Sequence, residues 1–245
     1  MEEEGRVGGG LDRFREWLTS LEWPILLVLA LIVAGSWIFV GLADLIVENE
    51  RQSSGFDEAL LLALREPQDV SDPIGPGAFE AAVRDVTALG SAAVLSLITV
   101  STAILLILRG NHRTAIILVI AIVGGTLLSV AFKDLFARPR PTLVPVEVRL
   151  SSFSFPSGHA MLAAVTYLTS GTLLARTQSR PVLKIYIMAV ALFITVAVGL
   201  SRVYLGVHWP TDVLAGWTAG VVWALMVWLL ANKLPAGNSG SPNVD

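Results

Sequence analysis

The chain has 245 residues, of which 54% are hydrophobic and only 15% are charged. An average soluble domain carries about 25% charged residues, so this composition argues against an ordinary soluble domain and against a disordered chain. The formal net charge of −3 gives no reason to expect a nucleic-acid partner. The absence of cysteine excludes a disulfide framework, a thiolate metal site and a thiol nucleophile.

Six largely uncharged runs are long enough to cross a membrane, since a membrane helix needs roughly 20 mostly apolar residues. We therefore expect an all-α polytopic membrane protein, a bundle of six transmembrane helices that forms one domain over residues 23–233. The tail 234–245 is rich in Gly, Ser, Pro and Asn and is expected to be disordered. The predicted spans are at about residues 24–46, 86–108, 114–132, 155–175, 183–201 and 212–232.

The segments outside these runs predict structure at the membrane surface. In residues 1–22, apolar side chains recur on one helical face, which predicts an N-terminal interfacial helix. The long connection 47–85 contains two short helical patterns, at about 56–64 and 76–84, which we expect to be interfacial helices of the first extracytoplasmic loop. This loop is either a plain linker or a lid or lipid entrance.

Polar residues gather at particular span ends. Spans three and five end on the same face of the membrane on which spans four and six begin, because successive spans alternate in direction. This rule brings three separated segments of the chain together without any further assumption. The segments contain Lys133 and Arg140, then Ser157, Gly158 and His159, and finally Arg202, His208 and Asp212.

The gathered set contains three cations, Lys133, Arg140 and Arg202, which together require an anion. An Arg side chain has a planar fork that matches phosphate oxygens, and Lys adds a point charge. Ser157 and Gly158 open the fourth span, where backbone N–H groups and the helix dipole also favour an anion. The pattern therefore predicts a phosphate-binding site.

Two histidines beside a phosphate site suggest phosphoryl transfer through a covalent intermediate. One neutral imidazole can attack phosphorus, and the other, when protonated, can donate to the leaving oxygen. Asp212 follows His208 by four residues, so its carboxylate is within plausible reach to orient that ring. A metal site made of His159, His208 and Asp212 is less favoured, because the surrounding cations would repel a metal.

Several other conspicuous residues have simpler interpretations. Arg138, Asp134 and Arg149 are interpreted as loop charges. Gly216 and Gly220 form a small-xxx-small pair, which indicates close helix packing in the sixth span.

The three polar segments resemble the three-part signature of the type-2 phosphatidic-acid phosphatase superfamily, the membrane lipid phosphate phosphatases. Every part matches without a gap or a substitution. The parts are Lys133, six residues and Arg140-Pro141; Pro156-Ser157-Gly158-His159; and Ser201-Arg202, five residues, His208, three residues and Asp212.

The resemblance implies a phosphate site and its contributors. Lys133, Arg140 and Arg202 would hold the phosphate, and the Ser157 and Gly158 region would help through backbone or hydroxyl donors. No metal or other cofactor is implied, and vanadate is expected to mimic the transition state.

The resemblance also implies a reaction. His208 would be the nucleophile that forms a phosphohistidine, Asp212 would orient it, and His159 would be the general acid for the leaving lipid alcohol. The expected activity is hydrolysis of a terminal phosphate or pyrophosphate of a lipid. Phosphatidylglycerol phosphate, undecaprenyl diphosphate and phosphatidic acid all share the phosphate that these residues would bind, so the motifs do not choose among them.

Basic residues predict the orientation in the membrane. The terminal side carries nine Lys and Arg, against eight on the other side, or five once the three phosphate-binding cations are set aside. The positive-inside rule then places the termini in the cytoplasm and the site on the periplasmic or outer face of a bacterial inner membrane. The expected partners are a lipid phosphate and membrane lipids.

Two other functions remain open at the level of the sequence. A lipid phosphotransferase would pass the phosphoryl group to an acceptor other than water. A transporter of anionic lipids would explain the Lys and Arg residues, but it would not require two His and an Asp at this spacing.

Overall fold

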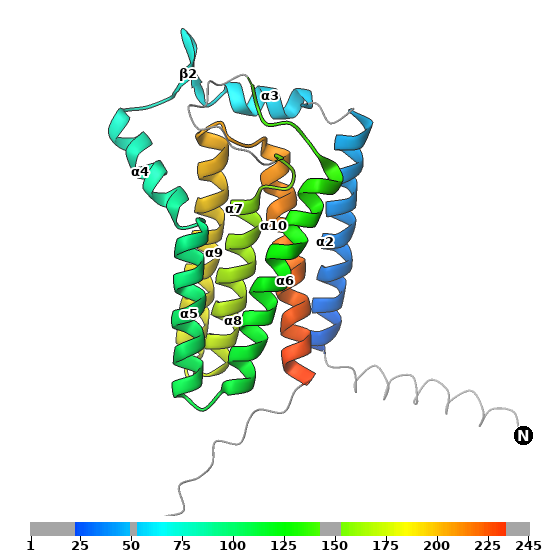
Figure 1. Ribbon diagram of the computed structural model, residues 1–245, viewed down its shortest axis with the longest axis vertical. Helices are drawn as coiled ribbons and strands as arrows, with labels where there is room; N and C mark the ends of the chain where they lie inside the picture. Colours follow the sequence, from blue (N-terminus) through cyan, green and yellow to red (C-terminus); the bar gives the residue numbers. More distant parts are fainter. Residues whose placement is uncertain (1–22, 50–52, 143–152, 234–245) are drawn as a thin grey trace, which may run out of the picture.

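The computed structural model describes residues 23–49, 53–142 and 153–233 of the chain (Figure 1). The N-terminal helix expected in residues 1–22 and the disordered tail expected in residues 234–245 lie outside these described residues.

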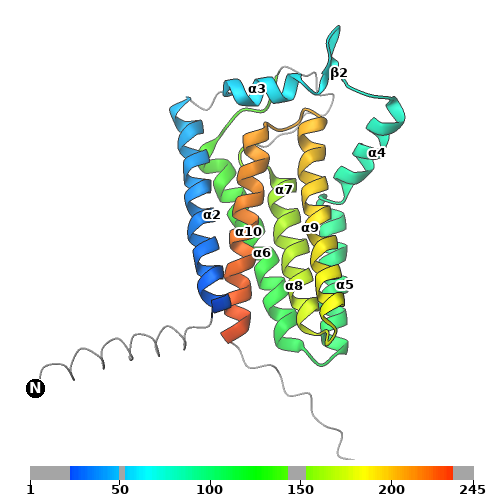
Figure 2. The same cartoon turned by 180° about the vertical axis from the view of Figure 1, so that it is seen from behind.

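Long helices packed side by side dominate the described part of the chain (Figures 1 and 2). Helices α7 and α8 are joined without a break by one π-helical stretch, η1, Ala164–Leu168. The α-helices are α2 Trp23–Glu48, α3 Gly55–Leu62, α4 Gly77–Ala88, α5 Ala92–Leu108, α6 His112–Phe136, α7 Gly158–Ala163, α8 Thr169–Arg176, α9 Pro181–Tyr204 and α10 Pro210–Lys233.

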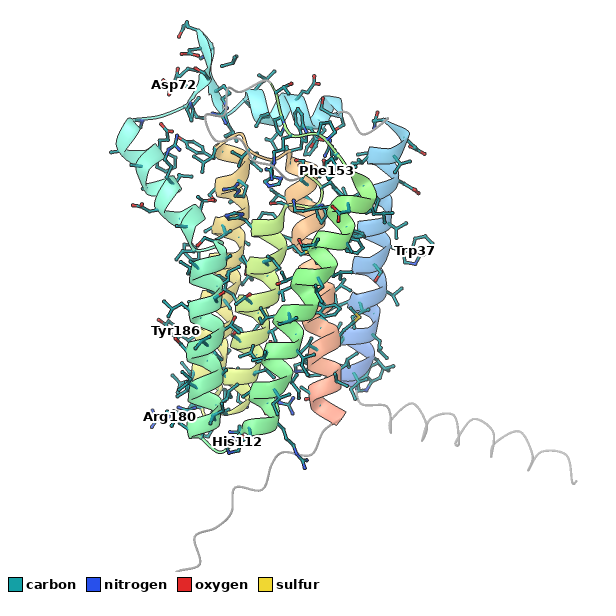
Figure 3. All side chains as sticks on the ribbon, in the orientation of Figure 1. Trp37, Asp72, His112, Phe153, Arg180 and Tyr186 are labelled. Carbon is teal, nitrogen blue, oxygen red and sulfur yellow. The ribbon has the colours of Figure 1, made fainter. Side chains whose placement is uncertain are left out.

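Four of the described helices, α2, α6, α9 and α10, are long and apolar enough to cross a membrane. The bent pair α4 and α5 would make a fifth crossing if both are counted as one span. Apolar side chains cover the outside of the bundle, where Trp37 is 73% and Tyr186 65% exposed, and both point away from it (Figure 3). Such a surface suits lipid rather than water, so the chain is a multi-pass helical membrane protein.

The region of the predicted second span, 86–108, is broken into two helices. Helix α4 ends at Ala88, and α5 begins at Ala92 at an angle of 49° to it. The cause is local, because the Ser91 hydroxyl caps α5 by accepting a hydrogen bond from the backbone N–H of Val94. The short helix expected at 76–84 and the start of the second span are therefore one element, α4.

The first loop forms helix α3, a short hairpin and helix α4, with α3 lying across one end of the bundle (Figure 1). Ser54 and Asp57 form a capping box that explains why α3 starts at Gly55. The hairpin was not predicted from the sequence. Its strands, β1 Arg65–Glu66 and β2 Asp69–Pro73, pair antiparallel with Arg65 opposite Pro73.

The stretch from α7 to α8 packs against α9 and α10 in the core of the bundle. Gly216 and Gly220 allow this contact, because a Cβ atom on Gly216 would lie 2.8 Å from the carbonyl oxygen of Ser157. A Cβ atom on Gly220 would lie 2.5 Å from the Cβ atom of Ala164. The two glycines thus serve helix packing, as their spacing indicated, and they bring α10 close to the start of α7.

Candidate active site

The predicted site residues lie at one end of the bundle, where α6 and α9 end and α7 and α10 begin (Figure 1). Two contacts bring the separated segments together. The backbone N–H of Ser157 donates to the carbonyl of Asp212 at 2.9 Å, which joins the starts of α7 and α10. A Cβ atom on Gly158 would lie 3.4 Å from the Cε atom of Lys133, which places the end of α6 beside the start of α7.

His208 lies just outside α10, which begins at Pro210. Its side chain is only 1% exposed, and its Nδ1 atom is 3.4 Å from the Oδ2 atom of Asp212. The Oδ2 atom also accepts a hydrogen bond from the backbone N–H of Trp209 at 3.0 Å. The carboxylate is therefore held against the imidazole, as its spacing in the sequence suggested.

The second ring nitrogen of His208 faces a cation. The Nη1 atom of Arg140 lies 3.1 Å from His208 Nε2 and also donates to the carbonyl of Val207 at 2.8 Å. A guanidinium can only donate, so Nε2 accepts this hydrogen bond and the ring proton is on Nδ1, toward Asp212. His208 is thus oriented with its unprotonated nitrogen toward Arg140.

Burial affects the protonation of His208 and Arg140, the two residues of this contact, which both lie in loops. It lowers the pKa of His208 to about 3, although Asp212 opposes this shift, so the imidazole is neutral near pH 7. Burial also lowers the pKa of Arg140, with Asp212 again acting in the opposite direction. An Arg side chain stays charged under such a shift, so a neutral imidazole lies beside a cation.

The remaining basic side chains complete the site. Arg202 is 7% exposed and donates from Nη1 to the Thr87 hydroxyl of α4 at 3.0 Å. Its Nε atom and the hydroxyl of Ser157 are buried and have no hydrogen-bond partner among the described residues. Lys133 donates from Nζ to the carbonyl of Phe153 at 2.6 Å. Buried donors without partners suit a site for an anion with several oxygens.

His159 lies at the break between α4 and α5. A Cβ atom on Gly90 would lie 3.1 Å from the Cδ2 atom of His159 and 2.5 Å from a methyl carbon of Val198. Only a residue without a side chain fits there, so the break in the second span also makes room for this histidine. The apolar run at 86–108 in the sequence does not reveal this contact.

The interpretation of Arg138 as a loop charge is wrong. This side chain is 1% exposed and donates at 2.7 Å both to Asp212 Oδ1 and to Asp57 Oδ2 of α3. The chain turns sharply after α6, where Ala137 has a positive φ of 46°, and this turn directs the following segment back over the bundle. Asp134 is exposed, and Arg149 lies outside the described residues.

Two further polar residues of the site, Ser154 and Asp57, were not predicted from the sequence. Ser154 is buried, donates its hydroxyl proton to Asp212 Oδ2 and lies 3.3 Å from His208 Nδ1. Asp57 is also fully buried. The only sequence signal for Asp57 was its place in a capping box, which predicts a helix start and says nothing about burial.

The described residues contain no group of three or more His, Asp or Glu that could hold a metal ion. The conceivable metal site of His159, His208 and Asp212 is therefore not formed by the geometry of these residues.

The fold and the site define a class of protein, a multi-pass membrane protein with a basic, histidine-containing site at one end of its helical bundle. A sequence model of the PAP2 superfamily matches residues 114–235, about half of the chain. The chain belongs to the PAP2 superfamily, and the matched region includes all the residues of the three-part signature.

Curated relatives align over just under half of the chain. Phosphatidylglycerophosphatase B of Bacillus subtilis is 43% identical over 115 residues, which cover 45% of this chain and 55% of that protein. Undecaprenyl-diphosphatase of Sulfolobus acidocaldarius is 34% identical over 124 residues, which cover 49% of this chain and 56% of that protein. The chain thus spans about half the length of these relatives.

Solved structures extend the likeness to most of the bundle. The crystal structure of a transmembrane PAP2 type phosphatidylglycerolphosphate phosphatase from Bacillus subtilis matches with a TM-score of 0.69 at 29% identity. That match covers 83% of this chain and 96% of the other. LpxE of Aquifex aeolicus matches with a TM-score of 0.52 at 24% identity, over 73% of this chain and 98% of the other, and supports the fold alone.

Proposed function

We propose that this chain is an integral-membrane lipid phosphatase that hydrolyses a terminal phosphate or pyrophosphate of a lipid through a phosphohistidine intermediate. One observation carries the proposal. The imidazole of His208 is buried between Arg140 on its Nε2 side and Asp212 on its Nδ1 side. This arrangement suits a nucleophile whose attacking nitrogen faces the cation that would bind its target. The curated relatives named above are phosphatases, which supports the same reaction.

The phosphate is held by the cations of the site. Lys133, Arg140 and Arg202 neutralise its charge, and the buried hydroxyl of Ser157 and the backbone beside Gly158 supply further donors. The same interactions become stronger in the transition state, where negative charge develops on the phosphoryl oxygens.

The reaction then proceeds in two displacements. His208 Nε2 attacks phosphorus, the bond between phosphorus and the lipid oxygen breaks, and His159 donates a proton to the leaving oxygen. Asp212 accepts the Nδ1 hydrogen bond and stabilises the positive charge of the phosphorylated ring. Water then attacks phosphorus, with His159 accepting its proton, and phosphate leaves as His208 is restored.

The proposed topology has six spans, namely α2, α4 with α5, α6, α7 through α8, α9 and α10. Helix α2 begins and α10 ends at the end of the bundle away from the site (Figures 1 and 2). An even number of spans puts the start of the first span and the end of the last on the same side of the membrane, which agrees with this placement. We infer that one six-span domain covers residues 23–233, in a bacterial inner membrane with the site on the periplasmic face and α3 at the membrane surface.

Phosphate release by the purified protein tests the proposed function. The protein in liposomes would be offered phosphatidic acid, phosphatidylglycerol phosphate and undecaprenyl diphosphate in the presence of EDTA. Wild-type protein should release phosphate from at least one of them, and the relative rates would identify the lipid class. His208→Ala should lower the rate by about a thousand-fold or more, since it removes the nucleophile.

The control is His112→Ala, because His112 lies at the opposite end of the bundle from the site (Figure 3). This variant should retain the wild-type rate. A His208→Ala variant that inserts normally and keeps a tenth of the activity would rule out His208 as the nucleophile. Transfer of the phosphoryl group to an added lipid alcohol, without release of phosphate, would instead identify a phosphotransferase.

A further inference from the structure

A buried ion-pair network connects the first-loop helix α3 to the carboxylate of Asp212. Arg138 donates from Nη1 to Asp212 Oδ1 and from Nη2 to Asp57 Oδ2, each at 2.7 Å. The three side chains are at most 1% exposed. One guanidinium thus bridges two carboxylates that come from opposite ends of the sequence.

Thr211 closes the network into a ring. Its backbone N–H donates to Asp57 Oδ1 at 2.9 Å, and its hydroxyl donates to Asp57 Oδ2 at 2.8 Å. The same hydroxyl accepts from Arg138 Nη1 at 2.8 Å. The ring of Trp209 covers the guanidinium at 5.6 Å, which shields the network further. Each partner is held by more than one contact, so the network has little freedom to rearrange.

We propose that Arg138 and Asp57 are positioning residues of the phosphatase, which hold Asp212 against His208 and set the net charge around that pair. This inference rests on the proposed function. It makes α3 a structural part of the reaction centre, rather than only the linker or the lid that the sequence left open.

Arg138 and Asp57 fix the orientation of the Asp212 carboxylate. The two oxygens of Asp212 have separate partners, with Oδ1 on Arg138 and Oδ2 on Ser154, the backbone of Trp209 and His208 Nδ1. Because Arg138 is anchored at its other end by Asp57, it holds Oδ1 in one place. The carboxylate therefore cannot rotate, and Oδ2 remains directed at the imidazole.

Asp57 also sets the net charge beside His208. A single ion pair between Arg138 and Asp212 would cancel the negative charge that must stabilise the phosphorylated, cationic ring of His208. The carboxylate of Asp57 leaves the three-residue network with a net charge of −1, which matches the charge that His208 acquires. Arg138 is thus shared between two carboxylates and neutralises neither of them fully.

Other charges act on Asp212 from several elements. Arg138 and Arg140 lie in the segment after α6, and His208 lies in the loop before α10. Lys133 lies on α6 and is also within electrostatic range. Of these groups, Lys133 and Arg140 are the cations that would bind the phosphate, whereas Arg138 bridges Asp212 and Asp57.

Kinetics of matched variants test the proposal. Asp57→Asn should lower kcat by about 10- to 100-fold, the usual effect of losing a group that orients an active-site ligand, and should leave KM within about two-fold. Glu58→Gln is the control, because it makes the same change on the neighbouring, exposed residue of α3. Equal kcat values for Asp57→Asn and Glu58→Gln would overturn the inference.

A double-mutant cycle separates positioning from mere support of the fold. If Asp57 acts through Arg138, the double variant Asp57→Asn, Arg138→Gln should be no slower than Arg138→Gln alone. Effects on kcat that multiply would show that the two residues act independently, and would overturn the inference.

The pH profile of kcat supplies a readout that a structural role would not move. Arg138→Gln leaves two adjacent carboxylates without a cation between them, so they hold a proton more readily and the acid limb should move to higher pH. Arg138→Lys keeps the charge and should restore the limb, although it lacks the fork and should remain slower than wild type. This variant also serves if Arg138→Gln does not fold. An acid limb at the wild-type pH in Arg138→Gln, or one that Arg138→Lys fails to restore, would count against the proposed charge balance.

Orthovanadate binding distinguishes this inference from the proposed function, because it needs no lipid. The dissociation constant of vanadate is measured from the rise in melting temperature that vanadate causes. This constant should increase about ten-fold in Asp57→Asn and stay unchanged in Glu58→Gln. If no lipid is hydrolysed but this difference is found, the proposed activity fails and the positioning role stands. Equal vanadate affinities in Asp57→Asn, Arg138→Lys and Glu58→Gln would overturn the positioning role itself.

Discussion

At the scale of single residues, burial determines the chemistry of His208. The ring is enclosed by protein, so its charged form loses the solvation that water would provide, and its pKa falls to about 3. Arg140 on one side and Asp212 on the other then select the tautomer. A residue that is a common pH sensor on a protein surface is kept here as a neutral base.

This low pKa predicts how stability depends on pH. The ordinary pKa of 6.5 applies in the unfolded state, so the unfolded chain binds more protons than the folded one between about pH 3 and 6.5. The free energy of unfolding should therefore decrease as the pH falls through this range. Melting temperatures in detergent at pH 7 and pH 4.5 would measure the decrease.

The variant His208→Asn should lose less stability over the same pH interval, because it lacks the group that must take up a proton on unfolding. His112→Asn is the matched control and should behave like the wild type. An equal loss in the wild type and in His208→Asn would show that other groups cause the pH dependence.

At the scale of the elements, the site depends on how closely α10 packs against α7. Gly216 and Gly220 face α7 and the start of η1, and their Cβ positions would come within 2.8 Å of neighbouring atoms. Near the site, the contact of Gly216 is with the carbonyl of Ser157. The distance between these two helices therefore affects the position of the α7 N-terminus as well as the stability of the bundle.

The variant Gly216→Ala should lower both stability and activity. Overpacking of this kind costs about 1–3 kcal/mol, and the displacement of Ser157 should reduce phosphate binding. Gly41→Ala on α2 is the control, because a Cβ atom there has nothing within 4 Å. Unfolding curves and phosphate release measured together would reveal the difference. Wild-type stability and activity in Gly216→Ala would contradict the close contact between α10 and α7.

At the scale of the whole molecule, the two ends of the bundle differ. The site, α3 and the hairpin lie at one end, and the turns that contain His112 and Arg180 lie at the other (Figure 3). In the proposed orientation, the first end faces the periplasm and the second faces the cytoplasm. A hydrolase at the outer face would meet the phosphorylated head groups of the outer leaflet.

Single cysteines test this orientation, and the natural chain contributes no background because it contains none. Asp72→Cys places a thiol on the exposed hairpin, and Arg180→Cys places one in the exposed turn at the opposite end. A membrane-impermeant maleimide should label Asp72→Cys in intact cells, but Arg180→Cys only after permeabilisation. The reverse pattern would invert the proposed topology.

The sequence by itself determined the apolar spans and the end of the bundle at which the polar residues meet. Hydropathy is a local property of each run, and it located α6, α9 and α10 within a few residues of their observed ends. The alternation of successive spans then required Lys133, His159 and His208 to lie at the same end. Neither conclusion needed knowledge of side-chain packing.

Only the tertiary structure decided which other residues join the site. Arg138, Asp57 and Ser154 looked like ordinary polar residues of loops and short helices, because burial and ion pairing depend on segments far away in the sequence. The break at Gly90 was equally hidden, since the hydropathy of the run does not reveal the close contact of Gly90 with His159 and Val198. Local composition specifies which segments cross the membrane, whereas the packing of these segments against one another specifies which side chains they enclose.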